Sequence, residues 1–131
     1  RLIKEDINNV HLIHGNAQIF LEDSIEDNTL DNIFLFHPDP WIKKKHHKRR
    51  VITPKFLDVI AKKLTPNGKL QLSTDYTPLW ESMMETISDH KKFIEAEDKN
   101  FWEEKYQSHW TDYSIEDNRS FHKGTFQLMA L

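Results

Sequence analysis

Hydrophobic residues along the chain follow two spacings, one typical of strands and the other typical of helices. Short apolar runs, bounded by Asn, Gly or Pro, predict five strands. These are residues 10–14, 32–36, 69–74, 93–96 and 124–131. The run at 32–36 is almost continuously apolar, as expected for a strand that is buried on both faces of a parallel sheet.

Two longer segments have helical spacing, and each follows a Thr-Pro pair. Thr53-Pro54 predicts an N-cap with proline at the first helical position, and helical spacing of apolar residues continues to Leu64. Thr77-Pro78 repeats this signal, and its apolar stripe ends at Ile87. The remaining segments predict a helix end at 1–9, a helical turn at 17–21, a turn at 66–68 and a long loop or excursion at 99–119. Alternating strands and helices followed by two late strands indicate an α/β sheet with an antiparallel end.

The second predicted strand ends in a loop that presents one carboxylate. His37 stops the apolar run, and Pro38-Asp39-Pro40-Trp41 follows at once. Each proline fixes its own φ angle and restricts the residue before it, so Asp39 is constrained from both sides. The end of a parallel strand is where open α/β sheets bind ligands. Taken alone, however, an Asp between prolines is more often a turn residue than a catalytic one.

A concentrated positive charge follows this loop. Residues 43–50 contain six Lys or Arg, two His and no acidic residue. Because the whole chain has a net charge of −3 and this run carries +6, the other residues sum to −9. One basic patch on an acidic body suggests that a polyanion docks at a defined place. A solvated face, a disordered segment or a localisation signal are the common alternatives.

The overall composition fits a soluble globular protein with a modest core, since 37% of its 131 residues are hydrophobic and 30% are charged. Its apolar runs are far too short to span a bilayer, and no signal peptide is visible. The absence of cysteine excludes disulfides and thiolate metal sites, and agrees with a cytoplasmic location. His46-His47 has no third ligand motif nearby, so no metal site is predicted.

The loop and the basic run together resemble a known signature. Pro-Asp-Pro-Trp followed by K-x-x-H-x-K-R-R is similar to the pattern of the bacterial tRNA (guanine-N7-)-methyltransferases, which are class I enzymes dependent on S-adenosylmethionine. The resemblance implies an α/β, Rossmann-like three-layer sandwich that transfers a methyl group to N7 of a variable-loop guanine in tRNA. Amino-group methyltransferases have a related [DN]-P-P-[YW] loop, but the residue order here and the basic tail favour the tRNA enzymes.

The resemblance also implies roles for single residues. Asp39 would bind the cofactor, S-adenosylmethionine, and act in catalysis, while Asn16 stands where the family usually has Asp beside the adenine. Lys43 and Asp75 match positions that contact the tRNA substrate. Contacts with RNA are implied for Lys44, Lys45, His46, His47, Lys48, Arg49 and Arg50. Without the resemblance, Asn16 is equally explained as a turn residue and Lys43 as a solvated lysine.

One motif departs from the family pattern. The family ends its recognition loop with T-x-F-E, whereas this chain reads Thr111-Asp112-Tyr113-Ser114. Thr111 and the aromatic Tyr113 are kept, but Ser114 replaces the expected glutamate, and Glu116 lies two residues later. Thr111, Tyr113 and Ser114 remain the candidates for binding the substrate guanine.

The resemblance covers only about the second half of the family's domain. Upstream, family members carry a glycine-rich loop and an acidic strand end that hold the methionine moiety and the ribose of the cofactor. No G-x-G occurs here and the chain begins at Arg1, so we interpret residues 1–131 as the C-terminal portion of one domain that lacks its first two strands. The strand at 32–36 would then be an exposed edge, and the isolated chain would bind the cofactor weakly. A non-catalytic RNA-binding module or an inactive fragment is the alternative.

Overall fold

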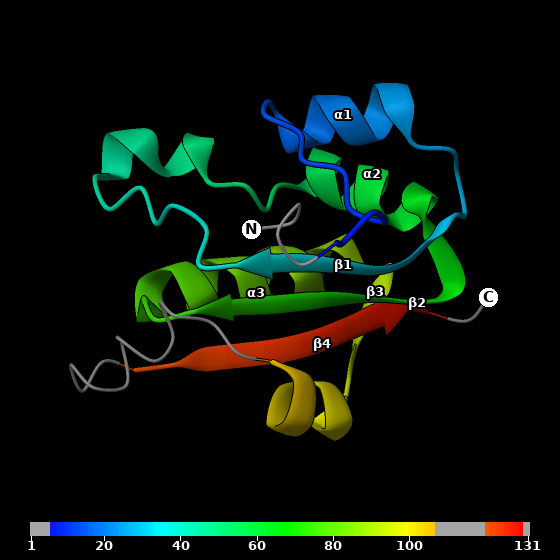
Figure 1. Ribbon diagram of the computed structural model, residues 1–131. Coiled ribbons are helices and arrows are strands. Elements are labelled where there is room, and N and C mark those ends of the chain that lie inside the picture. The colour runs from blue at the N-terminus through cyan, green and yellow to red at the C-terminus, as the bar shows by residue number, and fades with distance from the viewer. Residues whose placement is uncertain (1–5, 107–119, 130–131) are drawn as a thin grey trace.

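A four-stranded sheet with the strand order β1-β2-β4-β3 organises the chain (Figure 1). The computed structural model describes residues 6–106 and 120–129. The strands are β1 (Leu30–Phe36), β2 (Leu64–Thr74), β3 (Phe93–Ala96) and β4 (His122–Leu128). β1 is parallel to β2, whereas β4 runs antiparallel to both β2 and β3. The predicted α/β sheet with an antiparallel end is therefore confirmed.

The described residues also form three α-helices and two short helices, of which the first precedes β1 and the others lie between strands. They are α1 (Ala17–Ser24), the 3₁₀ helix η1 (Lys44–Arg49), α2 (Pro54–Lys63), α3 (Thr77–His90) and the π-helix η2 (Phe101–Lys105). Thr53 caps α2 as predicted, because its hydroxyl accepts a hydrogen bond of 3.1 Å from the Phe56 N–H. The expected cap at Thr77 is wrong. Tyr76 precedes the first residue of α3, and the Thr77 hydroxyl pairs with Nε2 of His122 at 2.9 Å.

The alternation of side chains along β2 separates the two faces of the sheet. Leu70 and Leu72 are fully buried in the hydrophobic core that α2 and α3 complete. Gln71 and Ser73 point to the opposite face, where η2 and the residues around it lie. The helices and this segment therefore form two outer layers with the sheet between them (Figure 1). The core consists of Ile52, Phe56, Leu57, Val59, Ile60, Leu64, Leu70, Leu72, Leu79, Met83, Ile87, Phe93 and Phe126.

Aromatic rings cover the second face at the β1 side. Phe34 and Phe36 of β1 lie 5.2 and 6.2 Å from the ring of Phe101, measured between centroids. Tyr106 packs edge-on against Phe36 at 4.9 Å, and its hydroxyl pairs with the Ser73 hydroxyl at 3.1 Å. Phe34 nevertheless remains 50% exposed. The segment that contains η2 is thus held to the sheet by stacking as well as by hydrogen bonds.

Three sequence predictions are wrong in detail. No strand forms at residues 10–14, where Leu12 is 82% exposed. A strand needs a hydrogen-bonded neighbour, and in the described part of the chain β1 is the sheet edge and pairs only with β2. Residues 66–68 form no separate turn but belong to β2, at a shift in register between the Leu30–Leu64 and Asn32–Lys69 pairs. The expected loop at 99–119 contains η2, and its residues 107–119 lie outside the described part.

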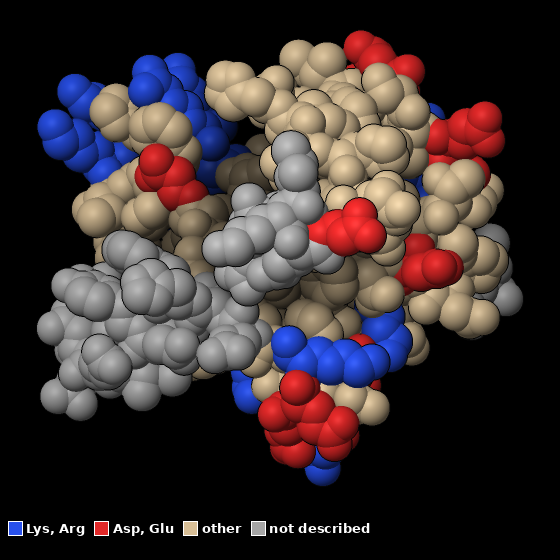
Figure 2. All heavy atoms as spheres, viewed as in Figure 1, with Lys and Arg blue, Asp and Glu red and all other residues tan. Residues whose placement is uncertain are grey.

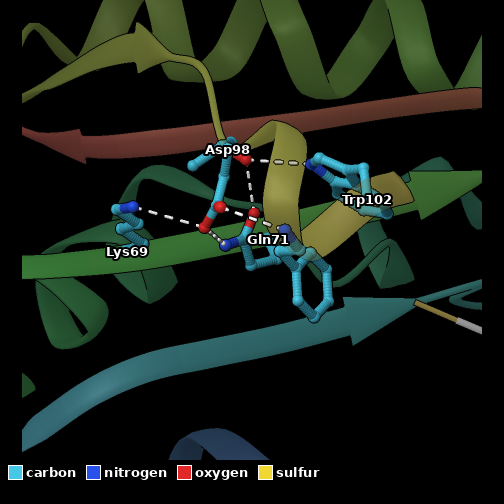
Figure 3. Close-up of polar contacts among 6 residues, drawn as sticks. Lys69, Gln71, Asp98 and Trp102 are labelled. Atoms are coloured by element: carbon cyan, nitrogen blue, oxygen red, sulfur yellow. Dashed lines mark hydrogen bonds and ion pairs between the residues drawn. The ribbon is translucent and has the colours of Figure 1, made fainter. Parts of the chain in front are cut away.

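A polar network fastens the η2 segment to the middle of the sheet (Figure 3). The Asp98 carboxylate accepts hydrogen bonds from Lys69 Nζ at 3.2 Å and from Gln71 Nε2 at 3.0 Å. The Thr125 hydroxyl donates to the Gln71 side-chain oxygen and accepts from Trp102 Nε1 at 3.0 Å. Gln71 and Thr125 are almost completely buried and face one another across β2 and β4. Each partner in the network therefore satisfies a polar group that burial would otherwise penalise.

We expect Asp98→Asn to weaken folding in a manner that depends on pH. Burial alone would raise the pKa of Asp98, but hydrogen bonds from the Phe101 N–H, Lys69 and Gln71 hold this pKa below its ordinary value. The stabilisation is therefore complete above the unfolded-state pKa of about 3.9 and is lost as pH falls through the lower folded-state pKa. Urea titration at pH 7 should show a loss of about 1–3 kcal/mol, and the loss should shrink below about pH 4.

A suitable control for this prediction is Asp23→Asn, which neutralises an exposed carboxylate on α1. This variant should unfold at the wild-type urea concentration throughout the pH range. If Asp98→Asn proves as stable as the control at pH 7, the network does not stabilise the fold.

Within residues 6–106 and 120–129, every helix is too short or too polar to cross a membrane.

Candidate active site

Asp39 and Asp75, predicted separately, lie in the lining of one pocket. The pocket has a volume of about 580 Å³ and is formed where β1 and β2 end. Its lining consists of His37, Pro38, Asp39, Pro40, Ile42, Thr74, Asp75 and Tyr76. The carboxyl ends of adjacent parallel strands meet at one edge of a sheet, so the topology alone brings these two carboxylates together.

The loop that carries Asp39 has an unusual backbone at both ends. His37 has a φ of 48° and Trp41 a φ of 43°, in the left-handed region that residues other than glycine rarely adopt. The His37 N–H donates to the Ser73 carbonyl at 2.8 Å, and the Trp41 N–H donates to Asp39 Oδ1 at 3.0 Å. One carboxylate oxygen of Asp39 thus closes the turn within the loop. Such strained positions often occur at functional sites, where the surrounding structure holds them in place.

His37 lines the pocket beside both carboxylates, and the sequence analysis did not single it out. Its ring stacks near Phe121, with 6.1 Å between the centroids. Burial lowers the pKa of His37 below its ordinary value, although the charge of Asp75 acts in the opposite direction. The ring is therefore largely neutral at pH 7. Its place between an apolar strand and a proline was the signal that could have identified it.

The basic run folds back onto the loop as the 3₁₀ helix η1. The Arg49 guanidinium lies 5.3 Å from the centre of the Trp41 ring, a cation–π arrangement. His46 contacts the same ring edge-on, with 5.7 Å between centroids. His47 Nε2 pairs with the Ile42 carbonyl at 3.2 Å. Trp41 therefore packs against the basic run.

Most cations of the run face outward, and Arg50 is the exception. Exposed members are Lys43, Lys44, Lys45, Lys48 and Arg49. Figure 2 shows a group of Lys and Arg side chains at the upper left, over the position that η1 occupies in Figure 1. Arg50 is only 9% exposed, and its Nε donates to the Pro40 carbonyl at 2.8 Å. Its guanidinium is thus in contact with the Asp39 loop.

Asn16 lies apart from the Asp39 pocket. Its side-chain oxygen accepts a hydrogen bond of 3.1 Å from the Ile19 N–H and so caps α1. It also lines a second hollow of about 280 Å³, together with Lys48, Arg49, Arg50 and Thr53. The predicted substrate residues Thr111, Tyr113 and Ser114 lie outside the described part of the chain. Among the described residues, no group of three or more His, Asp or Glu is arranged to hold a metal ion.

Comparison with known proteins identifies the family. A family described as "putative methyltransferase" matches residues 1–128. The chain belongs to this methyltransferase family. The resemblance seen in the Asp39 loop and the basic run is therefore confirmed, as is the Rossmann-like fold class.

Several curated relatives of this chain are named tRNA (guanine-N(7)-)-methyltransferase. The protein of Nitrosococcus oceani is 40% identical over 93 residues, which is 71% of this chain and 39% of the relative. The protein of Histophilus somni strain 2336 is 41% identical over 86 residues, or 66% of this chain and 34% of the relative. That of Pseudomonas aeruginosa is 37% identical over 101 residues, or 76% and 41%. The chain thus spans between about a third and two-fifths of the length of these relatives.

The family implies a methyl donor of the S-adenosylmethionine type in general. The pocket has a chemistry that fits such a donor. Its carboxylates have the sign of charge that attracts a sulfonium cation, while Pro38, Pro40 and Ile42 supply apolar walls for an organic body. The 580 Å³ volume lies within the usual range for small-molecule sites, about 300–1,000 Å³.

Proposed function

We propose that this methyltransferase acts in the cytoplasm and transfers the methyl group of S-adenosylmethionine to N7 of a guanine in the variable loop of tRNA. The observation that carries the proposal is the shared pocket of Asp39 and Asp75 beside the exposed cations of η1. A small-molecule site next to a polyanion surface suits a nucleic-acid-modifying enzyme. The names of the relatives support the same reaction.

Methylation of guanine N7 does not require a general base. Guanine N7 has a free lone pair, so the protein must align this atom with the methyl group and stabilise the charge that moves onto the purine. When bound, S-adenosylmethionine supplies an electrophilic methyl group on a sulfonium. Asp39, whose position the loop fixes, attracts that cation, and Asp75 accepts hydrogen bonds from the N–H groups of the guanine. Lys43, at the start of η1, contacts the tRNA.

The other proposed roles concern affinity and recognition. The exposed Lys44, Lys45, Lys48 and Arg49 bind phosphates, together with His46 and His47, and orient the tRNA without reading its sequence. Asn16 accepts or donates a hydrogen bond at the adenine of the cofactor in place of the family's usual aspartate. Thr111, Tyr113 and Ser114 contact the target guanine.

A labelled-methyl assay tests this function in the full-length protein. Tritiated S-adenosylmethionine and a tRNA transcript should give one product, and cleavage chemistry specific for 7-methylguanine should locate it in the variable loop. A transcript with 7-deazaguanine at that position lacks the N7 atom and should accept no methyl group. Methylation of the deaza transcript would point to an amino-group acceptor, and tRNA binding without any methylation would favour a non-catalytic RNA-binding module.

A further inference from the structure

We infer that Arg50 is a positioning residue that fixes the Asp39 loop, and that it does not bind tRNA phosphate like the rest of the basic run. Arg50 lines the same hollow as Lys48 and Arg49, but it is buried whereas those two side chains are exposed. The Nε atom of Arg50 is committed to the Pro40 carbonyl at 2.8 Å, across ten residues of sequence. The inference rests on the proposed function, because the loop matters only if Asp39 acts in the reaction.

The loop has few other means of holding its shape. Pro38 and Pro40 have no N–H to donate, so the backbone between His37 and Trp41 can form few hydrogen bonds of its own. His37 and Trp41 also occupy the left-handed region, at a cost of about 1–3 kcal/mol each. The His37 N–H anchors the strand side of the loop, and the Asp39 carboxylate closes its interior. Arg50 supplies the anchor on the far side.

Arg50 also ends η1. Its backbone N–H donates to the His47 carbonyl at 3.0 Å, so the residue stands where the basic helix stops. The adjacent Arg49 lies over the Trp41 ring at 5.3 Å. The phosphate-binding helix and the Asp39 loop are therefore joined at two neighbouring residues. A tRNA that binds η1 is therefore held in a fixed position relative to Asp39.

Lysine cannot reproduce the hydrogen-bond geometry of this arginine. The guanidinium is planar and presents its donors in a rigid fork, whereas a lysine ammonium is a point charge on a flexible stem. Arg50→Lys keeps the charge and removes the Nε–H that bonds Pro40. If Arg50 contacted a phosphate, this exchange would change the affinity for tRNA very little, since lysine also binds phosphate well. The exchange therefore separates the two roles.

The first test observes the loop without any assay of activity. Incorporation of 5-fluorotryptophan labels the four tryptophans of the chain for ¹⁹F NMR, and Trp41→Phe assigns the loop resonance. Arg50→Lys should shift or broaden the Trp41 resonance and leave that of Trp80 on α3 unchanged. Lys55→Arg, an exchange at an exposed cation of α2, should leave both unchanged. An unmoved Trp41 resonance in Arg50→Lys would overturn the inference.

The second test separates positioning from binding in the full-length protein. Arg50→Lys should lower kcat for tRNA methylation by roughly 10-fold, because a loop displaced by a fraction of an ångström misaligns the site. The slope of log Kd against log salt should stay at its wild-type value. Wild-type kcat in Arg50→Lys would show that only the charge matters and would overturn the inference. A wild-type protein with no methylation activity would instead refute the proposed function, and the ¹⁹F result would still stand.

A folding defect would be seen as the loss of the separate Trp80 and Trp102 resonances. In that case Arg50→Gln takes the place of Arg50→Lys. Glutamine has a side chain of moderate length that keeps an N–H donor, and it removes the buried charge. The positioning role predicts a moved Trp41 resonance with an unchanged salt slope. A slope lower by about one, with the Trp41 resonance in place, would identify Arg50 as a phosphate contact.

Discussion

Replacement of Asp39 with asparagine in the full-length protein is expected to lower kcat for tRNA methylation by about 10²–10³-fold. Asparagine keeps the oxygen that accepts the Trp41 N–H, so the loop should retain its turn. Only the negative charge that we propose attracts the sulfonium is lost. The Kd for tRNA should change by less than about threefold, because phosphate contacts supply most of the affinity. Single-turnover rates and filter-binding titrations measure the two quantities.

The matched control is Asp89→Asn, which neutralises an exposed carboxylate on α3 away from the pocket. Its kcat and its Kd should both equal the wild-type values. Similar losses of rate and affinity in Asp39→Asn would contradict the catalytic role, since they would mark Asp39 as a docking or folding element.

Removal of three exposed lysines of η1 should produce the largest change in tRNA affinity. In the variant Lys44→Ala, Lys45→Ala, Lys48→Ala, up to three phosphate contacts are lost, so tRNA binding releases fewer counterions. The slope of log Kd against log salt should therefore fall by up to about 3. The affinity for every tRNA should fall by a similar factor, because these contacts carry no sequence information. The side chains are exposed, so the thermal midpoint should stay near that of the wild type.

An equal loss of charge elsewhere serves as the control for that titration. Lys55, Lys62 and Lys92 are also exposed, and their replacement with alanine changes the net charge by the same amount. The control should leave the salt slope almost unchanged, because a distributed field contributes less than direct contacts. Equal slopes for the two triple variants would show that η1 is merely solvated and that tRNA binds elsewhere.

The parts of the site that could be predicted depend on local rules. The prolines on both sides of Asp39 predict a stiff loop. Asp75 follows β2, which the parallel sheet places next to β1 and therefore next to this loop. Thr53 caps α2 because a hydroxyl, a proline and an apolar stripe agree within a few residues. In each case the residues that decide the structure are close together in the sequence.

The parts that could not be predicted depend on distant partners. Residues 10–14 have a strand-like pattern, but a strand also requires a neighbour to accept its hydrogen bonds. The burial of Arg50 is set by the Pro40 carbonyl, which no charge pattern reveals. Gln71 sits between two leucines of β2, and only the fold brings Asp98 and Thr125 to it.

The open edge of β1 has a consequence for how concentrated solutions of this chain behave. In the described part of the chain β1 ends the sheet, and the backbone groups along that side can template a strand from another molecule. Residues 33–36 are uncharged, apolar and rich in aromatic rings, the composition that favours cross-β stacking. Asp31 and Asn32 precede them and are exposed, so they act as gatekeepers against self-association. Storage at high ionic strength, which screens the charge of Asp31, should therefore hasten fibril growth.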